Sequence, residues 1–300
     1  MKILVTGVSG QLGHDTVNEA LKRGHEVAAT DVIPPANCAS PFFPMDITDR
    51  ALVSAELDRI RPDVVIHCAA WTNVDGAEDE ENRPKVDRIN HIGTRNIAEA
   101  CAAIGCGMMY ISTDYVFDGQ GTRPWQPDDK NYAPLNVYGQ SKLDGELAVS
   151  SLLEKFFIVR IAWVFGLNGK NFIKTMVNVG KTHDEVRVVD DQIGTPTYTK
   201  DLARLLVDMV ETDKYGYYHA TNSESAPGEY ISWADLAEEA YRAAGMKVKV
   251  NRVTTAEYGL SKAARPFNSR LDKSKLAEAG FTPLPDWRDA VKRYIEEAQL

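Results

Sequence analysis

The chain has 300 residues, of which 44% are hydrophobic and 26% are charged, and its formal net charge is −9. A chain of this length can bury a sizeable core and suits one large domain or two closely joined ones. The negative charge argues against a nucleic-acid partner, because phosphate binding needs clustered lysines and arginines. No apolar run is long enough to span a bilayer, so we expect no membrane association.

The first half of the chain alternates short apolar runs with amphipathic stretches. Strands are predicted at residues 2–6, 26–30, 63–67, 108–112 and 157–161, and helices at residues 11–23, 49–61, 86–104 and 138–153. Strands that alternate with helices indicate a parallel sheet with right-handed crossovers. Continuously apolar strands suit a sheet that helices cover on both faces. We therefore predict an α/β fold with a Rossmann-type doubly wound parallel sheet.

After about residue 162 the pattern loosens. Further helices are predicted near residues 172–182, 200–211, 233–244 and 287–298. Two short strands, near residues 186–189 and 217–220, are expected to return to the main sheet. We predict an NAD(P)-binding domain of residues 1–161 with about 185–222. A smaller C-terminal substrate-binding domain is predicted to comprise about 162–184 and 223–300. The Pro-, Gly- and Asp-rich segment 119–136 reads as a long loop, and such loops are usually functional.

The N-terminal apolar run is interrupted at Gly7, too early for the apolar core of a signal peptide. The four cysteines are scattered without a CxxC pair, which fits a reduced, cytoplasmic protein. The six histidines show no metal-ligand spacing, so no structural metal is expected.

Three glycines follow the first predicted strand and open the first predicted helix. Gly7, Gly10 and Gly13 have the spacing G-x-x-G-x-x-G. Gly7 permits a tight turn, Gly10 lets the backbone approach a pyrophosphate, and Gly13 lets the helix pack close to the strand. The position of the motif favours dinucleotide binding over an ordinary glycine-rich turn.

Asp31 ends the second predicted strand, eighteen residues after Gly13. A carboxylate at this position can accept hydrogen bonds from the adenosine ribose, and it would repel a 2′-phosphate. No lysine or arginine lies between Asp31 and Met45 to compensate, so the residues favour NADH. The alternative is a solvated loop aspartate.

A phenol and an ammonium group, Tyr138 and Lys142, lie at i and i+4 on the helix after the fourth predicted strand. A nearby cation favours the phenolate, so we expect the pKa of Tyr138 to fall and the phenol to act as a proton donor. Thr113, at the end of that strand, can hydrogen-bond the substrate oxygen beside Tyr138. A second YxxxK, at Tyr258, lies outside the dinucleotide-binding half and is interpreted as a surface or packing residue.

Together these residues resemble the extended short-chain dehydrogenase/reductase family, and within it the dTDP-4-dehydrorhamnose reductases, over nearly the whole chain. The long strings S-T-D-Y-V-F at residues 112–117 and A-P-L-N-V-Y-G at residues 133–139 make the resemblance specific. Further matching segments are residues 6–13, 69–75, 163–165, 191–197, 265–271 and 284–287.

The resemblance implies a role for each matching residue. Tyr138 would be the proton donor, Lys142 its partner, and Thr113 and Asp114 the pair that contacts the sugar. On the substrate side the resemblance implies that Trp163 packs on the substrate. It also implies that Arg265 and Asn268 belong to a loop on the substrate side. For the cofactor, the resemblance implies that Gly10, Gln11 and Leu12 contact the pyrophosphate and that Asp31 contacts the adenosine ribose. Asp46 and Ile47 would lie beside the adenine. Ala70, Trp71 and Thr72 would lie along the rest of the cofactor.

The implied reaction is reduction of dTDP-4-dehydro-6-deoxy-L-mannose to dTDP-L-rhamnose by NADPH or NADH. The family is usually described with NADPH, although Asp31 favours NADH. Some members form metal-bridged dimers, so the resemblance also suggests a homodimer. Two alternatives stay open. One is another sugar-nucleotide epimerase or dehydratase, although related dehydratases carry a glutamate where this chain has Tyr115. The other is a non-catalytic regulatory subunit of the methionine adenosyltransferase type.

Overall fold

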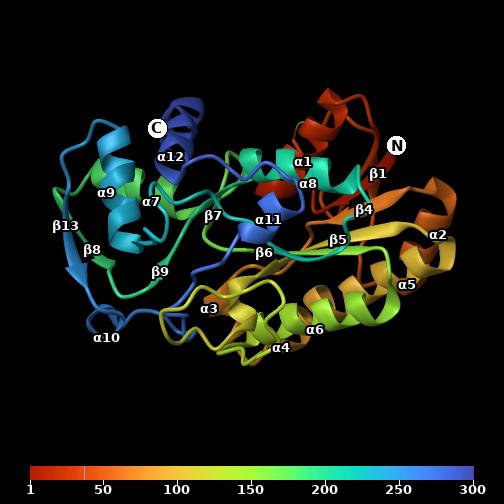
Figure 1. Ribbon diagram of the computed structural model, residues 1–300, viewed down its shortest axis with the longest axis horizontal. Helices are drawn as coiled ribbons and strands as arrows, with labels where there is room; N and C mark the ends of the chain where they lie inside the picture. Colours follow the sequence, from red (N-terminus) through yellow and green to blue (C-terminus); the bar gives the residue numbers. More distant parts are fainter. Residues whose placement is uncertain (37) are drawn as a thin grey trace.

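The computed structural model describes residues 1–36 and 38–300, and a seven-stranded parallel sheet forms its centre (Figure 1). The strand order is β11-β6-β5-β4-β1-β2-β3. In chain order the strands are β1 (Lys2–Thr6), β2 (Glu26–Asp31), β3 (Phe42–Pro44), β4 (Val64–His67), β5 (Gly107–Thr113), β6 (Phe156–Ile161) and β11 (Gly216–His219). The order reverses between β1 and β4, and ligands bind at the carboxyl ends of the strands at such a point. The predicted Rossmann-type sheet is confirmed.

Helices cover both faces of this sheet. On one face α1 (Gln11–Lys22) packs against α8 (Thr199–Val210), and Figure 1 shows the two side by side. The other face is covered by three helices, α2 (Arg50–Ile60), α5 (Thr94–Ile104) and α6 (Val137–Leu152). Two separate buried apolar clusters result, one on each side of the strands.

Strand β1 shows how these two clusters arise. Ile3 and Val5 belong to the cluster beneath α1 and α8, whereas Leu4 belongs to the cluster beneath α2, α5 and α6. Successive side chains of a strand point to opposite faces, so a strand covered on both sides must be apolar throughout. The continuous apolar run at the N-terminus therefore specifies a central strand.

The helix predicted at residues 86–104 is not a single regular α-helix. It comprises α4 (Arg83–Asp87), a π-helical turn η1 (Arg88–Gly93) and α5. A π-turn inserts one extra residue into the helical repeat and is frequent at functional sites. Here it places Asn90 fully in the interior, beneath the carboxyl ends of the strands.

The C-terminal part of the chain packs beside this sheet (Figure 1). Three helices form most of its apolar core, α7 (Phe172–Gly180), α9 (Trp233–Ala243) and α12 (Trp287–Ala298). Two-residue strands complete it as the pairs β7 (Val164–Phe165) with β10 (Thr197–Tyr198) and β9 (Ile193–Gly194) with β12 (Ile231–Ser232). The remaining short helices of the chain are α3 (Val74–Ala77), the 3₁₀ turn η2 (Asp114–Val116), α10 (Thr255–Tyr258) and α11 (Ser274–Glu278).

One of the two strands expected to return to the main sheet does so, and the other does not. β11 pairs with β6 at the edge of the main sheet. β8 (Glu185–Val189) instead pairs in parallel with β13 (Lys249–Val253) in a separate sheet, so its expected return is wrong. Charged residues alternate along β8, and only one of its faces can be buried, against α9. The domain boundaries themselves stay a prediction.

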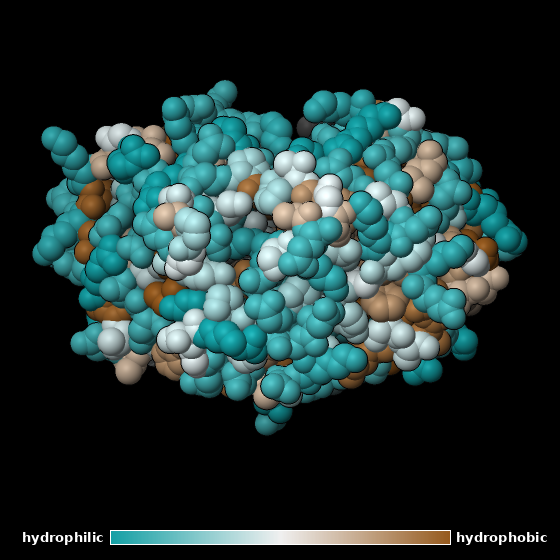
Figure 2. Space-filling view, viewed as in Figure 1, coloured by the Kyte–Doolittle hydropathy of each residue, from teal (hydrophilic) through white to brown (hydrophobic). Residues whose placement is uncertain are grey.

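No helix in the described part of the chain combines the length and apolarity needed to cross a membrane. The face of the molecule in Figure 2 is mostly hydrophilic, with apolar residues scattered between polar ones. Single exposed apolar residues of this kind are normal on a protein surface.

A buried ion pair joins the sheet to α6. Arg160 on β6 and Glu146 on α6 are both fully buried, and the Arg160 Nη2–Glu146 Oε2 distance is 2.8 Å. Arg160 also donates to the backbone oxygen of Pro127 at 3.1 Å and lies over the ring of Phe117. The pair therefore anchors the predicted loop 119–136 to the core.

Replacing Glu146 with alanine leaves the Arg160 guanidinium charged and unpaired in the interior. We expect Glu146→Ala to lower the free energy of unfolding by about 3–5 kcal/mol. Asp58→Ala, which breaks the exposed pair with Arg61, should change it by less than about 1 kcal/mol. Urea denaturation of the two variants measures both values, and equal losses would show that the buried pair is no more important than an exposed one.

Candidate active site

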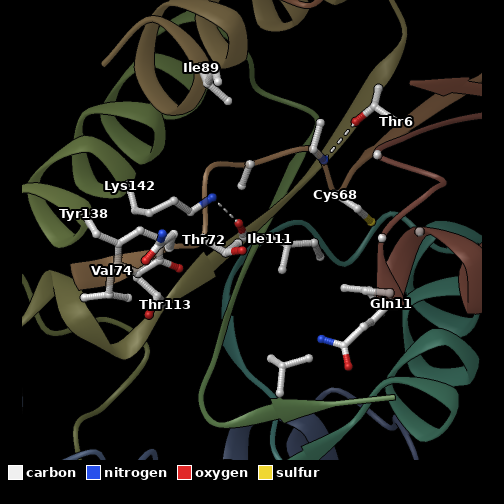
Figure 3. A pocket seen from close by; sticks show the side chains of 18 of the residues that line it. Thr6, Gln11, Cys68, Thr72, Val74, Ile89, Ile111, Thr113, Tyr138 and Lys142 are labelled. Atoms are coloured by element: carbon white, nitrogen blue, oxygen red, sulfur yellow. Dashed lines mark hydrogen bonds between the residues drawn. The ribbon is translucent and has the colours of Figure 1, made fainter. Parts of the chain in front are cut away.

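A cavity of about 1490 Å³ opens at the carboxyl ends of the central strands. Figure 3 shows Thr113, Tyr138 and Lys142 on one side of it and Gln11 on the other. Most of the residues singled out in the sequence line this cavity. They are Gly7, Gly10, Gln11, Leu12, Gly13, Asp31, Asp46, Ile47, Ala70, Thr72, Thr113, Asp114, Tyr138, Lys142, Trp163 and Arg265.

The glycine loop packs closely against the neighbouring backbone and lines the cavity. Gly7 has φ +71°, in the left-handed region, and a Cβ added to it would lie 2.6 Å from the backbone nitrogen of Ala69. A Cβ on Gly13 would collide with the carbonyl group of Gly7. Helix α1 begins at Gln11, so its free backbone N–H groups point to the cavity wall. This cradle fits the pyrophosphate of a dinucleotide.

Asp31 lies at the end of β2 and closes the loop from the other side. Its Oδ2 accepts from the Ser9 backbone nitrogen at 3.0 Å, and its Oδ1 accepts from the Val32 nitrogen at 2.7 Å. The carboxylate is thereby fixed at the cavity wall, where the sequence placed it for contact with a ribose. Ile47 packs against Gly93 of the π-turn.

Lys142 is buried, and its Nζ donates to the backbone oxygen of Ile111 at 2.7 Å. The Nζ also lies 4.0 Å from the centre of the Tyr110 ring. Burial lowers the pKa of Lys142 to about 7, although the nearby Glu146 acts in the opposite direction. The ammonium group therefore titrates close to neutral pH.

The prediction that Lys142 lowers the pKa of Tyr138 is wrong. Burial raises the pKa of the Tyr138 phenol, while a hydrogen bond with Thr113 acts in the lowering direction. The physical reason is that Lys142 turns its Nζ to the Ile111 carbonyl, and desolvation disfavours the phenolate. The phenol thus keeps its proton, which a proton donor needs.

Thr113 and Asp114 follow β5 at the cavity wall. Thr113 Oγ1 donates to Asp114 Oδ1 at 3.0 Å, and the Tyr115 backbone nitrogen donates to Thr113 Oγ1 at 3.3 Å. Asp114 is 1% exposed, and burial raises the pKa of its carboxyl to about 6. Near pH 6 this carboxyl group is half-protonated, so it can donate a hydrogen bond to a sugar hydroxyl or accept one from it.

Trp163 has a left-handed backbone, with φ +50°, which is rare for a bulky residue. Its ring stacks on Trp233 with the ring centres 4.1 Å apart and an interplanar angle of 24°. Both rings line the cavity. The stack therefore forms an apolar part of the cavity wall.

Two residues named from the resemblance do not line the cavity. The Trp71 indole nitrogen donates to the Asn73 backbone oxygen at 2.9 Å. Asn268 is buried, and its Nδ2 donates to the backbone oxygens of Gln120 and Arg123 at 3.2 and 2.9 Å. Asn268 thus holds the loop 119–136, because its amide is consumed by that backbone.

Asn90, which sequence reasoning missed, joins the two sides of the site. Its Oδ1 accepts from the Trp71 backbone nitrogen at 2.8 Å, and its Nδ2 donates to the Trp71 oxygen at 3.1 Å and to Ser141 Oγ at 2.9 Å. Ser141 Oγ in turn donates to the backbone oxygen of Tyr138 at 2.8 Å. An asparagine inside a predicted helix, where its propensity is poor, is the one signal that could have found it.

Three cations that the sequence analysis did not single out also line the cavity, Lys85, Arg88 and Lys170. Lys85 lies over the Trp71 ring, and Arg88 Nη2 donates to Thr48 Oγ1 at 3.5 Å. The lining also includes carboxylates, those of Asp31, Asp46, Glu81 and Asp114, so charges of both signs are present. Lys170 lies far from the other two cations in the chain, so spacing could not reveal the group.

The second YxxxK is not part of this cavity. Tyr258 ends the short helix α10 in the C-terminal part, and neither it nor Lys262 is among the lining residues. Its interpretation as a surface or packing residue is consistent with that position.

A glycine loop at the switch point of a parallel sheet, facing a Thr–Tyr–Lys set, defines a dinucleotide-dependent enzyme of the extended short-chain dehydrogenase/reductase class. Within this class, residues 1–300 match the model of the RmlD substrate binding domain family, and the chain belongs to that family.

Named relatives extend over the same length. The dTDP-4-dehydrorhamnose reductase of Streptomyces griseus is 40% identical over 96% of this chain and 91% of that protein. A solved dTDP-4-dehydrorhamnose reductase from Clostridium acetobutylicum ATCC 824 is 40% identical, with a TM-score of 0.90 and 100% of both chains covered. Another, from Bacillus anthracis str. Ames in complex with NADP, is 38% identical, with a TM-score of 0.88 and 99% of both chains covered.

The raised pKa of Asp114 has a consequence for stability. Between about pH 4 and 6 the folded carboxyl keeps its proton while the unfolded one loses it, so stability present below pH 4 is lost as the pH rises through about 6. We expect Asp114→Asn to be more stable than the parent chain at pH 7.5 by about 2–3 kcal/mol, and equally stable below pH 4.

Urea denaturation at both pH values measures this difference. Asp184→Asn, at an exposed position, is the control and should change stability at neither pH. A destabilised Asp114→Asn at pH 7.5 would mean that the Asp114 charge is well solvated or paired.

Proposed function

We propose that this chain reduces the C4 ketone of dTDP-4-dehydro-6-deoxy-L-mannose (dTDP-4-dehydrorhamnose) to dTDP-L-rhamnose, with NADPH or NADH as the reductant. The observation that carries this proposal is the position of Tyr138, Lys142 and Thr113 across one cavity from the glycine loop. Similarity over the full chain to reductases of this name supports the substrate, and the NADP complex of one of them supports the cofactor.

The chain supplies the proton and the positioning. Tyr138 donates its phenol proton to the ketone oxygen, and the Thr113 hydroxyl turns its proton from Asp114 Oδ1 to donate a hydrogen bond to the same oxygen. A bound reduced nicotinamide supplies the hydride for the ketone carbon. Lys142 lies one helical turn from Tyr138 and binds the nicotinamide ribose through its Nζ. Because these groups are held on β5 and α6, little reorganisation is needed when the substrate arrives.

The cofactor is bound along the switch point. Gly10, Gln11 and Leu12 bind its pyrophosphate through backbone N–H groups at the start of α1, and Asp31 binds the adenosine ribose. Around the adenine and along the remaining length, the proposed contacts come from Asp46, Ile47, Ala70 and Thr72. Trp71 is left out, because it does not line the cavity and Asn90 binds both of its backbone groups.

The sugar nucleotide occupies the other half of the cavity. Asp114 contacts its hydroxyl groups, and Trp163 packs on its apolar face, supported by the stack with Trp233. Arg265 belongs to the wall of this half. Asn268 supports the site from outside by holding the loop 119–136.

The division into an NAD(P)-binding and a substrate-binding domain, a homodimeric state and a cytoplasmic location stay predictions. Size-exclusion chromatography with light scattering tests the second of these.

Removing the phenol oxygen should remove the proton donor. We expect Tyr138→Phe to lower kcat by about 10²–10⁴-fold, the usual range for lost acid–base catalysis. Tyr258→Phe is the matched control and should leave kcat within about twofold of the parent value. The assay follows reduced-nicotinamide absorbance with enzymatically made dTDP-4-keto sugar.

The same assay separates the competing functions. An epimerase converts its substrate without net consumption of NADPH or NADH, and a regulatory subunit shows no turnover. Unchanged activity of Tyr138→Phe would exclude the phenol from the mechanism, and a large loss in Tyr258→Phe would point to the other YxxxK.

Asp31 should control the choice of cofactor. We expect Asp31→Ser to raise the ratio of kcat/KM with NADPH to that with NADH by about tenfold, because the carboxylate that repels a 2′-phosphate is gone. Steady-state kinetics with each cofactor measures the ratio. If the ratio does not move, Asp31 does not contact the adenosine ribose.

A further inference from the structure

The wall of the cavity on the substrate side includes a segment without regular structure, residues 261–265. Arg265 is its member in the cavity lining. Its Nη1 donates to the Tyr115 hydroxyl group at 3.3 Å, and the Tyr115 ring lies edge-on to the Tyr138 ring with the centres 5.6 Å apart. The conformation of this segment therefore affects the surroundings of the reacting phenol.

One carboxylate holds this segment from the cofactor side. Asp75 Oδ1 accepts from the backbone nitrogens of Lys262 and Ala263 at 3.1 and 3.0 Å. Asp75 Oδ2 accepts from Arg265 Nη2 at 2.7 Å. Both oxygens are thus used on a segment that lies about 190 residues away in the chain.

Asp75 belongs to α3, which begins directly after the cofactor-side residues of the cavity. Asn73 and Val74 line the cavity, and Asn73 caps α3 by accepting from the Gly76 nitrogen at 3.0 Å. Three residues after Asp75, Glu78 Oε1 accepts from the Val137 nitrogen at 2.8 Å, in the first turn of α6. Helix α3 therefore contacts both the substrate-side segment and the helix that carries Tyr138.

The segment has a second attachment that also leads to α6. Asn136, the N-cap of α6, donates from its Nδ2 to the Ala264 oxygen at 2.8 Å and accepts from the Gly139 nitrogen at 2.7 Å. The backbone of residues 262–264 is thus held between α3 and the start of α6. A charge-assisted bond such as Asp75–Arg265 contributes more than these neutral ones.

We propose that Asp75 is a positioning residue for the sugar nucleotide, acting by holding residues 262–265 and the Arg265 guanidinium against Tyr115 at the substrate half of the cavity. This inference rests on the proposed function for the identity of the substrate. It assigns no contact between Asp75 and the substrate itself. Loss of the Asp75 charge releases the segment, so substrate binding weakens while the cofactor half of the cavity stays intact.

Asp75→Asn tests the proposal with little change in shape. The KM for dTDP-4-keto sugar should rise about tenfold and kcat should fall less than about threefold, since a charged hydrogen bond is lost away from the reacting atoms. The dissociation constant for NADPH, measured by fluorescence titration, should stay within about twofold. Asp75→Glu keeps the charge, so its KM should lie between those of Asp75→Asn and the parent chain.

The matched control is Asp79→Asn. Asp79 pairs with the Lys262 side chain on the same segment, but it holds no backbone nitrogen there. The Asp75 and Asp79 side chains are both 43% exposed, so the two variants are matched in contact with solvent. Its KM, kcat and NADPH dissociation constant should match those of the parent chain.

Limited trypsin digestion gives a readout that needs no activity. Lys262–Ala263 is the one cleavable bond within residues 261–266, because the Arg265–Pro266 bond resists trypsin. Cleavage after Lys262, followed by mass spectrometry, should be about tenfold faster in Asp75→Asn than in the parent chain and in Asp79→Asn. Thermal melting of each variant confirms that it is folded.

The outcomes separate the two proposals. A parent chain that consumes no reduced cofactor with any dTDP-4-keto sugar contradicts the proposed function, whereas the digestion still reports on the segment. Unchanged KM in Asp75→Asn, with or without faster cleavage, contradicts the positioning role. Weakened NADPH binding in that variant would also contradict it, because the effect would then lie in the cofactor half.

Discussion

The site depends on the hydrogen bonds of one buried amide, that of Asn90. It binds both backbone groups of Trp71, on the segment that follows β4, and it also binds Ser141, which bonds to the backbone of Tyr138. The amide is fully buried, so an unpaired donor or acceptor there would carry the full cost of desolvation. The cofactor-side segment and α6 are therefore held in one relative position, and the π-turn η1 is the local irregularity that brings the amide to this place.

Burial is the dominant electrostatic influence at the site. It lowers the pKa of Lys142, and it raises the pKa of both Asp114 and Tyr138. In each case the neutral form gains relative to the charged one, as expected where few water molecules reach a group. The cations Lys85, Arg88 and Lys170 lie at exposed positions around the same cavity. Near neutral pH the Tyr138 phenol therefore keeps its proton, whereas Lys142 and Asp114, with pKa values of about 7 and 6, can each change charge.

Much of the fold and part of the site follow from local patterns. The strands β1 and β4 are continuous apolar runs. The Gly7 motif directly follows β1, and the Tyr138 motif opens the helix that precedes β6, so local sequence indicates both. Asn90 could not be found in this way, because its partners lie 19 and 51 residues away in the chain. The role of Asp75 could not be found for the same reason, because its partners lie about 190 residues away in the chain. Strand β8 was misplaced because five residues with alternating charge do not say which neighbour they pair with. The pKa of Tyr138 was misjudged because the helical i, i+4 spacing does not show where Lys142 turns its Nζ.

The left-handed backbone at Trp163 gives this position an unusual tolerance. Side chains other than glycine destabilise such a conformation, by about 1–3 kcal/mol for a strained residue. Replacement by glycine, which has no Cβ, relieves the backbone at the same moment that it removes the ring from its stack with Trp233. The two effects oppose each other, so glycine here enlarges the cavity at a modest net loss of stability. Position 163 is for that reason the natural starting point for engineering the protein to accept bulkier sugars.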